Sequence, residues 1–260
     1  MASENENSPV IRVRNLQMSY GPVVIMQDLN FDVIPQDIFV IMGGSGCGKS
    51  TLWRHLIGLN EPTAGSVFYG MENFTAAAPE ARARMSRRFG VMYQSGALWS
   101  SLTLAENIAM PIEQHTQLAR REIRELVSYK LALVGLSGYE NHYPSQISGG
   151  MNKRAGIARA MALDPEILFL DEPGAGLDPL SSRRLDDLIL QLRDTLGSTV
   201  VVVTHELESI FAIANRAIFL DRETRTQAAI GNPYILRDHS ESIHVRDFLT
   251  RGAISKQESQ

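Results

Sequence analysis

The sequence predicts an α/β fold in which a parallel sheet is covered on both faces. Short apolar runs of strand length alternate with helical segments, as expected for buried parallel strands: 38–42, 167–170, 200–203 and 217–220. Between residues 10 and 39 the apolar runs instead alternate with turn signals, which predicts a small antiparallel sheet that 66–69 extends. The pattern from about 79 to 163 predicts mostly helix, with breaks at Pro111, Gly135, Gly138 and Pro144. The 260 residues can bury a full core as one large domain or two small ones.

A glycine-rich octapeptide, Gly-Gly-Ser-Gly-Cys-Gly-Lys-Ser at 43–50, joins the first apolar run to a predicted helix at 51–59. Its glycines let the backbone curl so that amide groups point at phosphate oxygens, and the helix N-terminus favours an anion. Lys49 would reach the β- and γ-phosphates, and the Ser50 hydroxyl can bind Mg²⁺. The pattern therefore predicts a nucleotide-phosphate loop rather than a simple turn, with these contacts: Gly43, Gly44, Ser45, Gly46, Cys47, Gly48, Lys49, Ser50 and Thr51.

Polar side chains end two of the later apolar runs. Asp171 and Glu172 follow 167–170, at the end of a parallel strand where ligands bind. We expect Asp171 to hold Mg²⁺, directly or through water, and Glu172 to accept a proton from the attacking water. His205 follows 200–203 in the same way, so we expect it to reach the γ-phosphate.

A second anion site is predicted at Ser148-Gly149-Gly150. These residues precede a helical stretch that Asp164-Pro165 ends. A helix N-terminus with flexible, small residues binds anions by the same physics as the first loop. Since the chain has one phosphate loop, its two phosphate sites must serve two ligands or one shared ligand.

Composition and charge exclude several classes of protein. The net charge of −4 gives no indication of a broad nucleic-acid surface. The arginines at 82–88 and 120–124 lie in helical stretches that also carry Glu80, Glu122 and Glu125, as on solvated helix faces. A single cysteine excludes an internal disulfide, and the histidines lack metal-ligand spacing. No apolar run reaches the roughly 20 residues that span a bilayer. We expect a cytosolic chain, disordered at 1–8, whose membrane link comes through a partner.

In order and spacing, the motifs of this chain resemble those of ABC transporter nucleotide-binding subunits: the phosphate loop, Gln94, Ser148-Gly149-Gly150, Asp171-Glu172, Gly176-Leu177-Asp178 and His205. The resemblance implies a RecA-like P-loop NTPase core with an antiparallel β subdomain. It also implies a helical subdomain at about 95–160, an ATPase domain at 9–235 and a C-terminal extension at 236–260. Two subunits would sandwich two ATP molecules, each between one phosphate loop and the partner's Ser-Gly-Gly segment.

The resemblance also implies roles for single residues. Tyr20 would stack on adenine, although a strand aromatic in the core is the alternative. Gln94 would sense Mg²⁺ and the transmembrane partner, and Asp178 would act across the dimer. The implied catalytic set is Lys49, Gln94, Glu172 and His205, and the implied Mg²⁺ set is Ser50, Gln94 and Asp171.

Three places depart from the usual motif pattern of the family and help to identify the subfamily: Ile147, Met151 and Gly174-Ala175-Gly176. With the runs at 94–99 and 111–116 they resemble the ATPases of Mla systems, which move phospholipids between the inner and outer membranes of Gram-negative bacteria. This implies a homodimer on the cytoplasmic face of the inner membrane, with a multispanning permease, an MCE-type substrate-binding protein and a small STAS-domain protein. The alternatives are another cargo, such as amino acids or ions, and a non-transport ABC switch protein. A module that only holds ATP is disfavoured by Glu172 and His205.

Two features leave alternatives open. Val245, Phe248 and Leu249 fall at helix spacing and would dock on their own subunit or on a neighbour. Cys47 lies near a helix N-terminus and Lys49, which can lower the pKa of a thiol, yet a small space-filling role is the better expectation.

Overall fold

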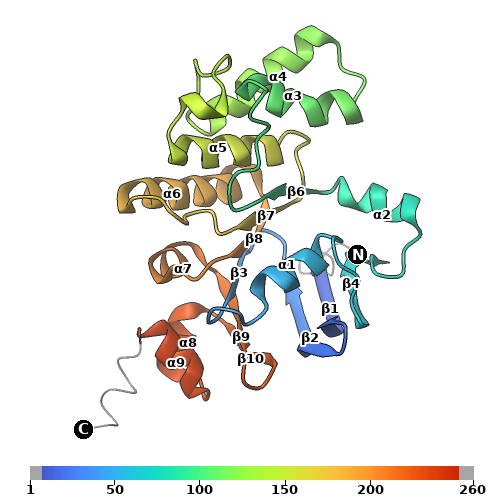
Figure 1. The fold of residues 1–260 in the computed structure, drawn as a ribbon, viewed down its shortest axis with the longest axis vertical. Helices are drawn as coiled ribbons and strands as arrows, with labels where there is room; N and C mark the ends of the chain where they lie inside the picture. Colours follow the sequence, from blue (N-terminus) through green and yellow to red (C-terminus); the bar gives the residue numbers. More distant parts are fainter. Residues whose placement is uncertain (1–7, 252–260) are drawn as a thin grey trace, which may run out of the picture.

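The computed structural model describes residues 8–251 (Figure 1). Residues 1–7, where we expect disorder, lie outside the described part. The strands are β1 (Ile11–Tyr20), β2 (Val23–Val33), β3 (Ile38–Met42), β4 (Ala64–Tyr69), β5 (Glu72–Asn73), β6 (Phe89–Met92), β7 (Ile167–Asp171), β8 (Thr199–Val203), β9 (Arg216–Asp221) and β10 (Thr226–Gly231). The helices are α1 (Lys49–Leu56), α2 (Pro79–Ser86), α3 (Leu104–His115), α4 (Arg120–Leu133), the 3₁₀ helix η1 (Pro144–Gln146), α5 (Gly149–Ala160), α6 (Pro179–Leu196), α7 (Leu207–Ile213), α8 (Pro233–His239) and α9 (Ile243–Leu249).

The main sheet has the strand order β10-β9-β3-β8-β7-β6, parallel except for β10. Side chains of a strand alternate between faces, and every residue of β3 is buried. Ile38, Val40 and Met42 belong to a first core with α5, α6 and α7. Phe39 and Ile41 belong to a second core with α1, β1 and β2. This confirms the prediction of a parallel sheet covered on both faces.

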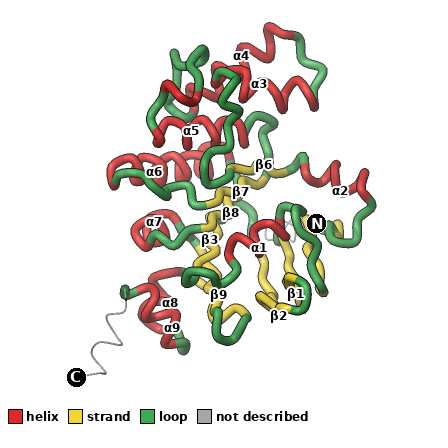
Figure 2. Tube along the Cα trace, viewed as in Figure 1, coloured by secondary structure: helices red, strands yellow, loops and turns green. Residues whose placement is uncertain are grey.

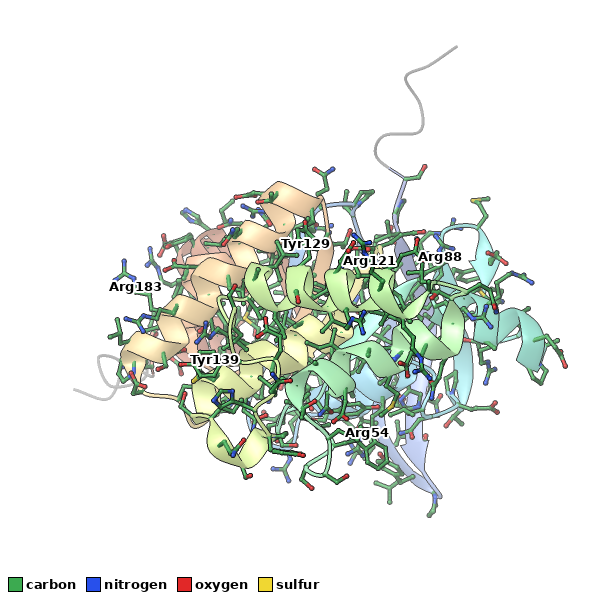
Figure 3. All side chains as sticks on the ribbon, turned by 90° about the horizontal axis from the view of Figure 1, so that it is seen from above. Arg54, Arg88, Arg121, Tyr129, Tyr139 and Arg183 are labelled. Carbon is green, nitrogen blue, oxygen red and sulfur yellow. The ribbon has the colours of Figure 1, made fainter. Side chains whose placement is uncertain are left out.

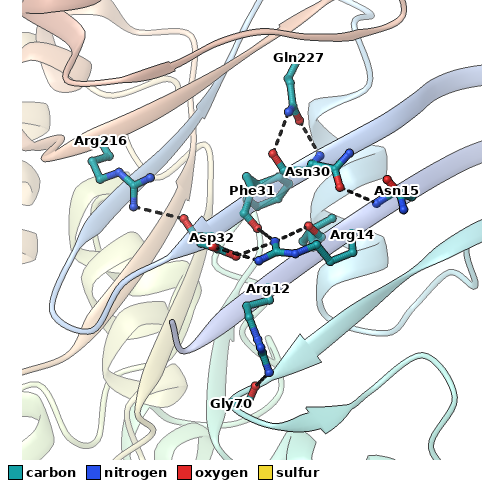
Figure 4. A network of polar contacts seen from close by, with 10 residues as sticks. Arg12, Arg14, Asn15, Asn30, Phe31, Asp32, Gly70, Arg216 and Gln227 are labelled. Atoms are coloured by element: carbon teal, nitrogen blue, oxygen red, sulfur yellow. Dashed lines mark hydrogen bonds and ion pairs between the residues drawn. The ribbon is translucent and has the colours of Figure 1, made fainter. Parts of the chain in front are cut away.

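The antiparallel sheet has the order β2-β1-β4-β5 and confirms the second part of the predicted fold. Its strand β2 is held against the main sheet by side chains (Figure 4). The Gln227 amide donates to the Asn30 carbonyl at 2.7 Å, and the Asn30 amide donates back to Gln227 Oε1 at 2.8 Å. Arg216 of β9 donates to the Asp32 carbonyl at 3.3 Å. These contacts hold β2 of the antiparallel sheet against β9 and β10 of the main sheet.

Helices α3, α4 and α5 gather at one end of the molecule, and α8 and α9 lie at the other (Figures 1 and 2). The sequence predicts mostly helix from 79 to 163, and this is wrong at β6, which adds an edge strand to the main sheet. The break expected at Pro111 is also wrong, because Pro111 lies inside α3. Burial of Leu104, Ile108 and Ile112 on one face of α3 offsets the roughly 3 kcal/mol cost of an interior proline.

The C-terminal helix α9 docks on its own subunit. Val245 and Leu249 are buried in the core that also contains Phe219, and the Phe248 ring lies 5.3 Å from the Phe219 ring. This decides between the two docking modes that the sequence leaves open. The expected boundary at 235/236 falls inside α8.

The basic helical stretches are paired with acidic residues, as expected of solvated faces. Arg88 contacts Glu166 at 2.8 Å and Arg121 contacts Glu125 at 2.8 Å; both arginines are labelled in Figure 3. Within residues 8–251, no helix combines the length and the apolar character that crossing a bilayer would require.

A buried carboxyl group joins α6 to α7. Asp186 is 9% exposed, and its Oδ2 accepts a hydrogen bond from the Ser209 hydroxyl at 3.0 Å. Burial raises the pKa of Asp186 to about 6, the Ser209 hydrogen bond opposes this, and Glu206 adds to it. Because the folded state holds this proton more tightly than the unfolded chain, stability falls as the pH rises from about 4 to about 6.

Asp186→Asn is therefore expected to raise the free energy of unfolding at pH 8 by about 1–2 kcal/mol, allowing for partial solvation. The uncharged amide keeps an oxygen for Ser209. Urea unfolding at pH 8 and at decreasing pH measures the gain, which should vanish near pH 4. Asp187→Asn, at the exposed next position, is the control and should show no such dependence. A gain that is equal at every pH would contradict the assignment.

Candidate functional site

The predicted polar residues come together at one edge of the main sheet. Strands β3, β8, β7 and β6 are neighbours in this order and run parallel. At their carboxyl ends they carry, in the same order, the phosphate loop, His205, Asp171-Glu172 and Gln94. The carboxyl edge of a parallel sheet is where α/β proteins bind ligands. Four segments that are distant in sequence thus form one site.

The phosphate loop turns sharply out of β3 because its glycines allow it. Gly43 has φ +147°, and a Cβ there would lie 2.5 Å from the Leu220 carbonyl oxygen, so no other residue fits. Residues 44–46 are exposed. The α1 helix begins at Lys49 with no acidic residue in its first turn, which leaves its N-terminal amides available to an anion.

Two side chains of the loop differ in exposure. The Lys49 ammonium donates to the carbonyl oxygens of Gly43 and Gly44, each at 2.9 Å, which places its charge over the loop. Cys47 is buried within the second core, and burial raises the pKa of its thiol, although Lys49 opposes this. The hypothesis of an activated thiol is therefore wrong, and the space-filling alternative fits.

Glu172 and His205 form a contact pair. The Glu172 amide donates to the Val203 carbonyl at 2.8 Å, which brings the ends of β7 and β8 together. Glu172 Oε1 then lies 2.8 Å from His205 Nδ1, whereas Glu172 Oε2 is buried with no hydrogen-bond partner. Glu172 also has φ +44°, a conformation that a non-glycine residue rarely adopts and that is frequent at functional sites. The geometry suits a base held by a histidine; the role itself stays a prediction.

Asp171 has the features expected of a metal ligand. Its Oδ1 is buried without a hydrogen-bond partner. Burial raises the pKa of Asp171, Glu172 adds to this, and Arg54, Lys153 and Lys49 oppose it. A divalent cation would satisfy this oxygen, so the residues fit Mg²⁺. In the described part of the chain, no three His, Cys, Asp or Glu side chains form a metal cluster, so further ligands must come from hydroxyl groups, the nucleotide or water.

Tyr20 lies on the surface beside the phosphate loop. It is 51% exposed, which is unlike the core aromatic that the sequence leaves as the alternative. A hydrogen bond with Thr51 lowers the pKa of its hydroxyl, and Asn60 Nδ2 donates to its Oη at 3.4 Å. An exposed ring held at the start of α1 is available for stacking.

The remaining predicted residues lie on helix N-termini. Ser148 caps α5, where its hydroxyl accepts from the Met151 amide at 3.3 Å, and Ser148 and Gly149 are exposed. Asp178 caps α6 through the amides of Leu180 and Ser181, and the bonds from Ser181 lower its pKa. The capping role of Asp178 is not among the sequence predictions, although Asp followed by Pro at the start of a helix is its signal.

Lys153 and Arg54 are site residues that the sequence argument did not identify. Lys153 of α5 is buried and donates to the Glu172 carbonyl at 3.1 Å. Arg54 of α1 lies near both Tyr20 and Asp171 and favours their charged forms. Both sit in helices next to predicted motifs, but no local pattern separates a charged residue that faces the site from one that faces water.

Comparison with known proteins agrees with this geometry. The family described as ABC transporter matches residues 26–175, more than half of the chain. The match begins in β2, includes the phosphate loop and ends just after Glu172.

Several curated proteins are similar over most of the chain. The probable ribonucleotide transport ATP-binding protein mkl of Mycobacterium leprae is 40% identical over 76% of this chain and 57% of its own length. MlaF of Haemophilus influenzae, an intermembrane phospholipid transport system ATP-binding protein, is 38% identical over 82% of this chain and 81% of its own. MetN of Ralstonia nicotianae, a methionine import ATP-binding protein, is 39% identical over 75% and 56%. The chain thus spans little more than half of mkl and MetN.

A solved structure shares the fold. The ATP-binding cassette MJ0796, described as dimeric in a post-hydrolysis state with ADP and phosphate, has a TM-score of 0.77 and 27% identity over 85% of this chain and 98% of its own. Together with the family match and the arrangement of motifs on the sheet edge, this shows that the chain belongs to the ABC transporter family and carries the ATPase domain of that family.

Proposed function

We propose that the chain is the ATP-hydrolysing subunit of an ABC transporter and that it powers phospholipid transport between membranes. The observation that carries the hydrolysis is the convergence of the phosphate loop, Asp171, Glu172 and His205 on one sheet edge. Lys49 and the α1 N-terminus bind the phosphates, and Glu172 takes a proton from the attacking water. His205 orients Glu172 and faces the γ-phosphate.

The same site would hold the magnesium ion of MgATP. Asp171 contributes its unpartnered oxygen, and the exposed Ser50 hydroxyl and Gln94 amide lie at the neighbouring element ends. When bound, Mg²⁺ neutralises charge on the phosphate oxygens. Among the chain's own residues, Lys49 positions the phosphates and Glu172 accepts the proton of the attacking water.

The subunit would act as a homodimer. Ser148 and Gly149 are exposed where α5 begins, and the first amides of a helix have no partner within the helix, so this segment can bind the γ-phosphate of a partner's ATP. Asp178 is likewise exposed at a helix N-terminus, that of α6. The dimeric description of MJ0796 supports this arrangement. ATP would then hold two subunits together, and hydrolysis would let them separate.

The phospholipid cargo rests on similarity to MlaF. MlaF is the relative above whose length the chain spans most fully, and Met151 after Ser-Gly-Gly together with the 94–99 run supports the same assignment. The comparable identities of mkl and MetN make a nucleotide or an amino acid the second candidate cargo. We propose the Mla-type partners: a multispanning permease, an MCE-type protein and a small STAS-domain protein, at the cytoplasmic face of the inner membrane. We also propose the division into an ATPase domain at 9–235, with a helical subdomain near 95–160, and an extension at 236–260.

Purification of the tagged chain from membranes tests the cargo. The proposal expects a permease and an MCE-type protein to co-purify, and mass spectrometry of the complex to find bound phospholipid above the level in a mock preparation. Reconstituted complex should also show ATP turnover that phospholipid stimulates and methionine does not. A complex with a periplasmic amino-acid-binding protein, stimulated by its amino acid, would replace the phospholipid cargo, and recovery with ribosomes or DNA would refute transport.

A further inference from the structure

One buried cation lies between the predicted catalytic elements. Lys153 projects from the second turn of α5 and is 8% exposed. A lysine is almost never this buried unless its ammonium has partners, since removing an unpaired charge from water is costly. Its partners therefore indicate what the side chain does.

Both hydrogen bonds of Lys153 go to the backbone of the candidate site. Its ammonium donates to the carbonyl oxygen of Gln94, at the end of β6, and to that of Glu172, at the end of β7, the latter at 3.1 Å. These are the peptide units that set the direction of the Gln94 and Glu172 side chains. One ammonium thus joins α5 to two elements of the sheet edge.

The surroundings of Lys153 are acidic. Burial lowers its pKa, and Glu206, Asp171 and Glu172 raise it. In return, Lys153 favours the ionised form of Asp171. The ammonium therefore also offsets part of the negative charge of the Asp171, Glu172 and Glu206 carboxylates before nucleotide binds.

The next turns of α5 hold the segment that follows Gln94. A Cβ at Gly156 would lie 3.0 Å from Gly96 Cα, so helix and loop are in direct backbone contact. Arg159 donates to the Ala97 carbonyl at 2.6 Å and to the Gly96 carbonyl at 3.3 Å. Positions 153, 156 and 159 recur every three residues and share one face of the helix. This face of α5 is a continuous support for the loop.

We propose that Lys153 is a positioning residue for ATP hydrolysis, which ties the α5 helix to the backbone of Gln94 and Glu172. The inference rests on the proposed function. Because Ser148 caps α5, a shift of that segment on binding a partner's nucleotide is passed by Lys153 to the Gln94 and Glu172 of its own site. Lys153 therefore links the two nucleotide sites of the dimer through one helix.

Lys153→Met tests this, because the thioether fills similar space but cannot donate to the two carbonyl oxygens. In the full chain as isolated from membranes, we expect kcat to fall by about 10²-fold, as small displacements of catalytic groups do, with KM for ATP changed by less than about threefold. Lys153→Arg keeps the charge and the donors and should restore kcat to within about tenfold of the wild type.

Arg154→Met is the matched control. Arg154 is the next residue of α5 and donates to the carbonyls of Val134 and Gly135 at 2.7 and 3.2 Å, away from the sheet edge. It loses the same kind of helix-to-backbone bonds, so we expect a lower melting temperature with kcat near the wild type. Lys153→Leu, which also has no charge and no hydrogen-bond donor, replaces the methionine variant if that protein does not fold.

The outcomes separate the two proposals. Wild-type kcat in Lys153→Met, an equal loss of kcat in Arg154→Met, or no recovery with arginine would overturn the positioning role while leaving ATP hydrolysis intact. A wild-type chain that neither binds nor hydrolyses ATP would instead refute the proposed function, and the role of Lys153 with it.

Discussion

Replacing Glu172 with glutamine is expected to slow ATP hydrolysis by about 10²–10⁴-fold while ATP still binds. The amide has the shape of the carboxylate but cannot accept the proton of the attacking water. Glu172 is held by His205 Nδ1 at 2.8 Å, and its other oxygen has no protein partner, so the substitution removes a base without removing a structural bond that glutamine could not make. Single-turnover phosphate release measures the rate, and equilibrium binding of a fluorescent ATP analogue measures the affinity.

The same variant tests the dimer. If hydrolysis is what separates the subunits, Glu172→Gln with excess MgATP should sediment as a dimer, and with ADP as a monomer. Glu208→Gln, three residues after His205 and strongly exposed, is the control and should keep wild-type turnover. Unchanged turnover in Glu172→Gln would assign the base to another residue, and a variant that stays monomeric with MgATP would exclude the shared nucleotide site.

Lys49→Ala is expected to weaken ATP binding by about 10- to 100-fold and to abolish turnover, since hydrogen bonds to a charged group are worth about 1.5–3 kcal/mol. The ammonium lies over the loop on the carbonyls of Gly43 and Gly44 and must move to the phosphates when nucleotide binds. Titration calorimetry with MgATP measures the loss. The melting temperature of the Lys49→Ala variant without nucleotide shows whether the substitution has disturbed the loop itself.

Arg222→Ala provides the control for Lys49, because Arg222 is an exposed cation whose guanidinium lies near Gly46 of the loop. Screening by solvent makes such a charge weak, so its loss should change ATP affinity by well under tenfold. If both variants bind ATP as the wild type does, the octapeptide is not the phosphate site.

The fold was predictable where elements are long or uniformly apolar. Strands β3, β7 and β8 are buried on both faces, and such strands read as apolar runs whatever their neighbours are. The four-residue β6, with Gly90 inside it, has no such pattern, and the sequence predicts helix there. Pro111 is a strong local breaker, yet α3 continues through it because packing of its apolar face outweighs local preference.

The order of the strands was beyond any local pattern. In the sequence β3 is followed by β4, β5 and β6, whereas in the main sheet it lies between β9 and β8. Only the packing of the core therefore decides which strand ends become neighbours. The same is true of Lys153. Nothing in its local sequence distinguishes it from Arg154, and its role follows from which face of α5 meets the sheet edge.

By itself, the sequence determined which groups carry the chemistry. The glycines and lysine of the phosphate loop and the carboxylates at strand ends can be identified because each motif consists of residues that are consecutive in the chain. Only the tertiary structure decided which of them meet: Glu172 with His205, Lys153 with both Gln94 and Glu172, and α9 with its own core. The reason is that contacts across tens of residues depend on burial and packing, which are properties of the whole folded chain.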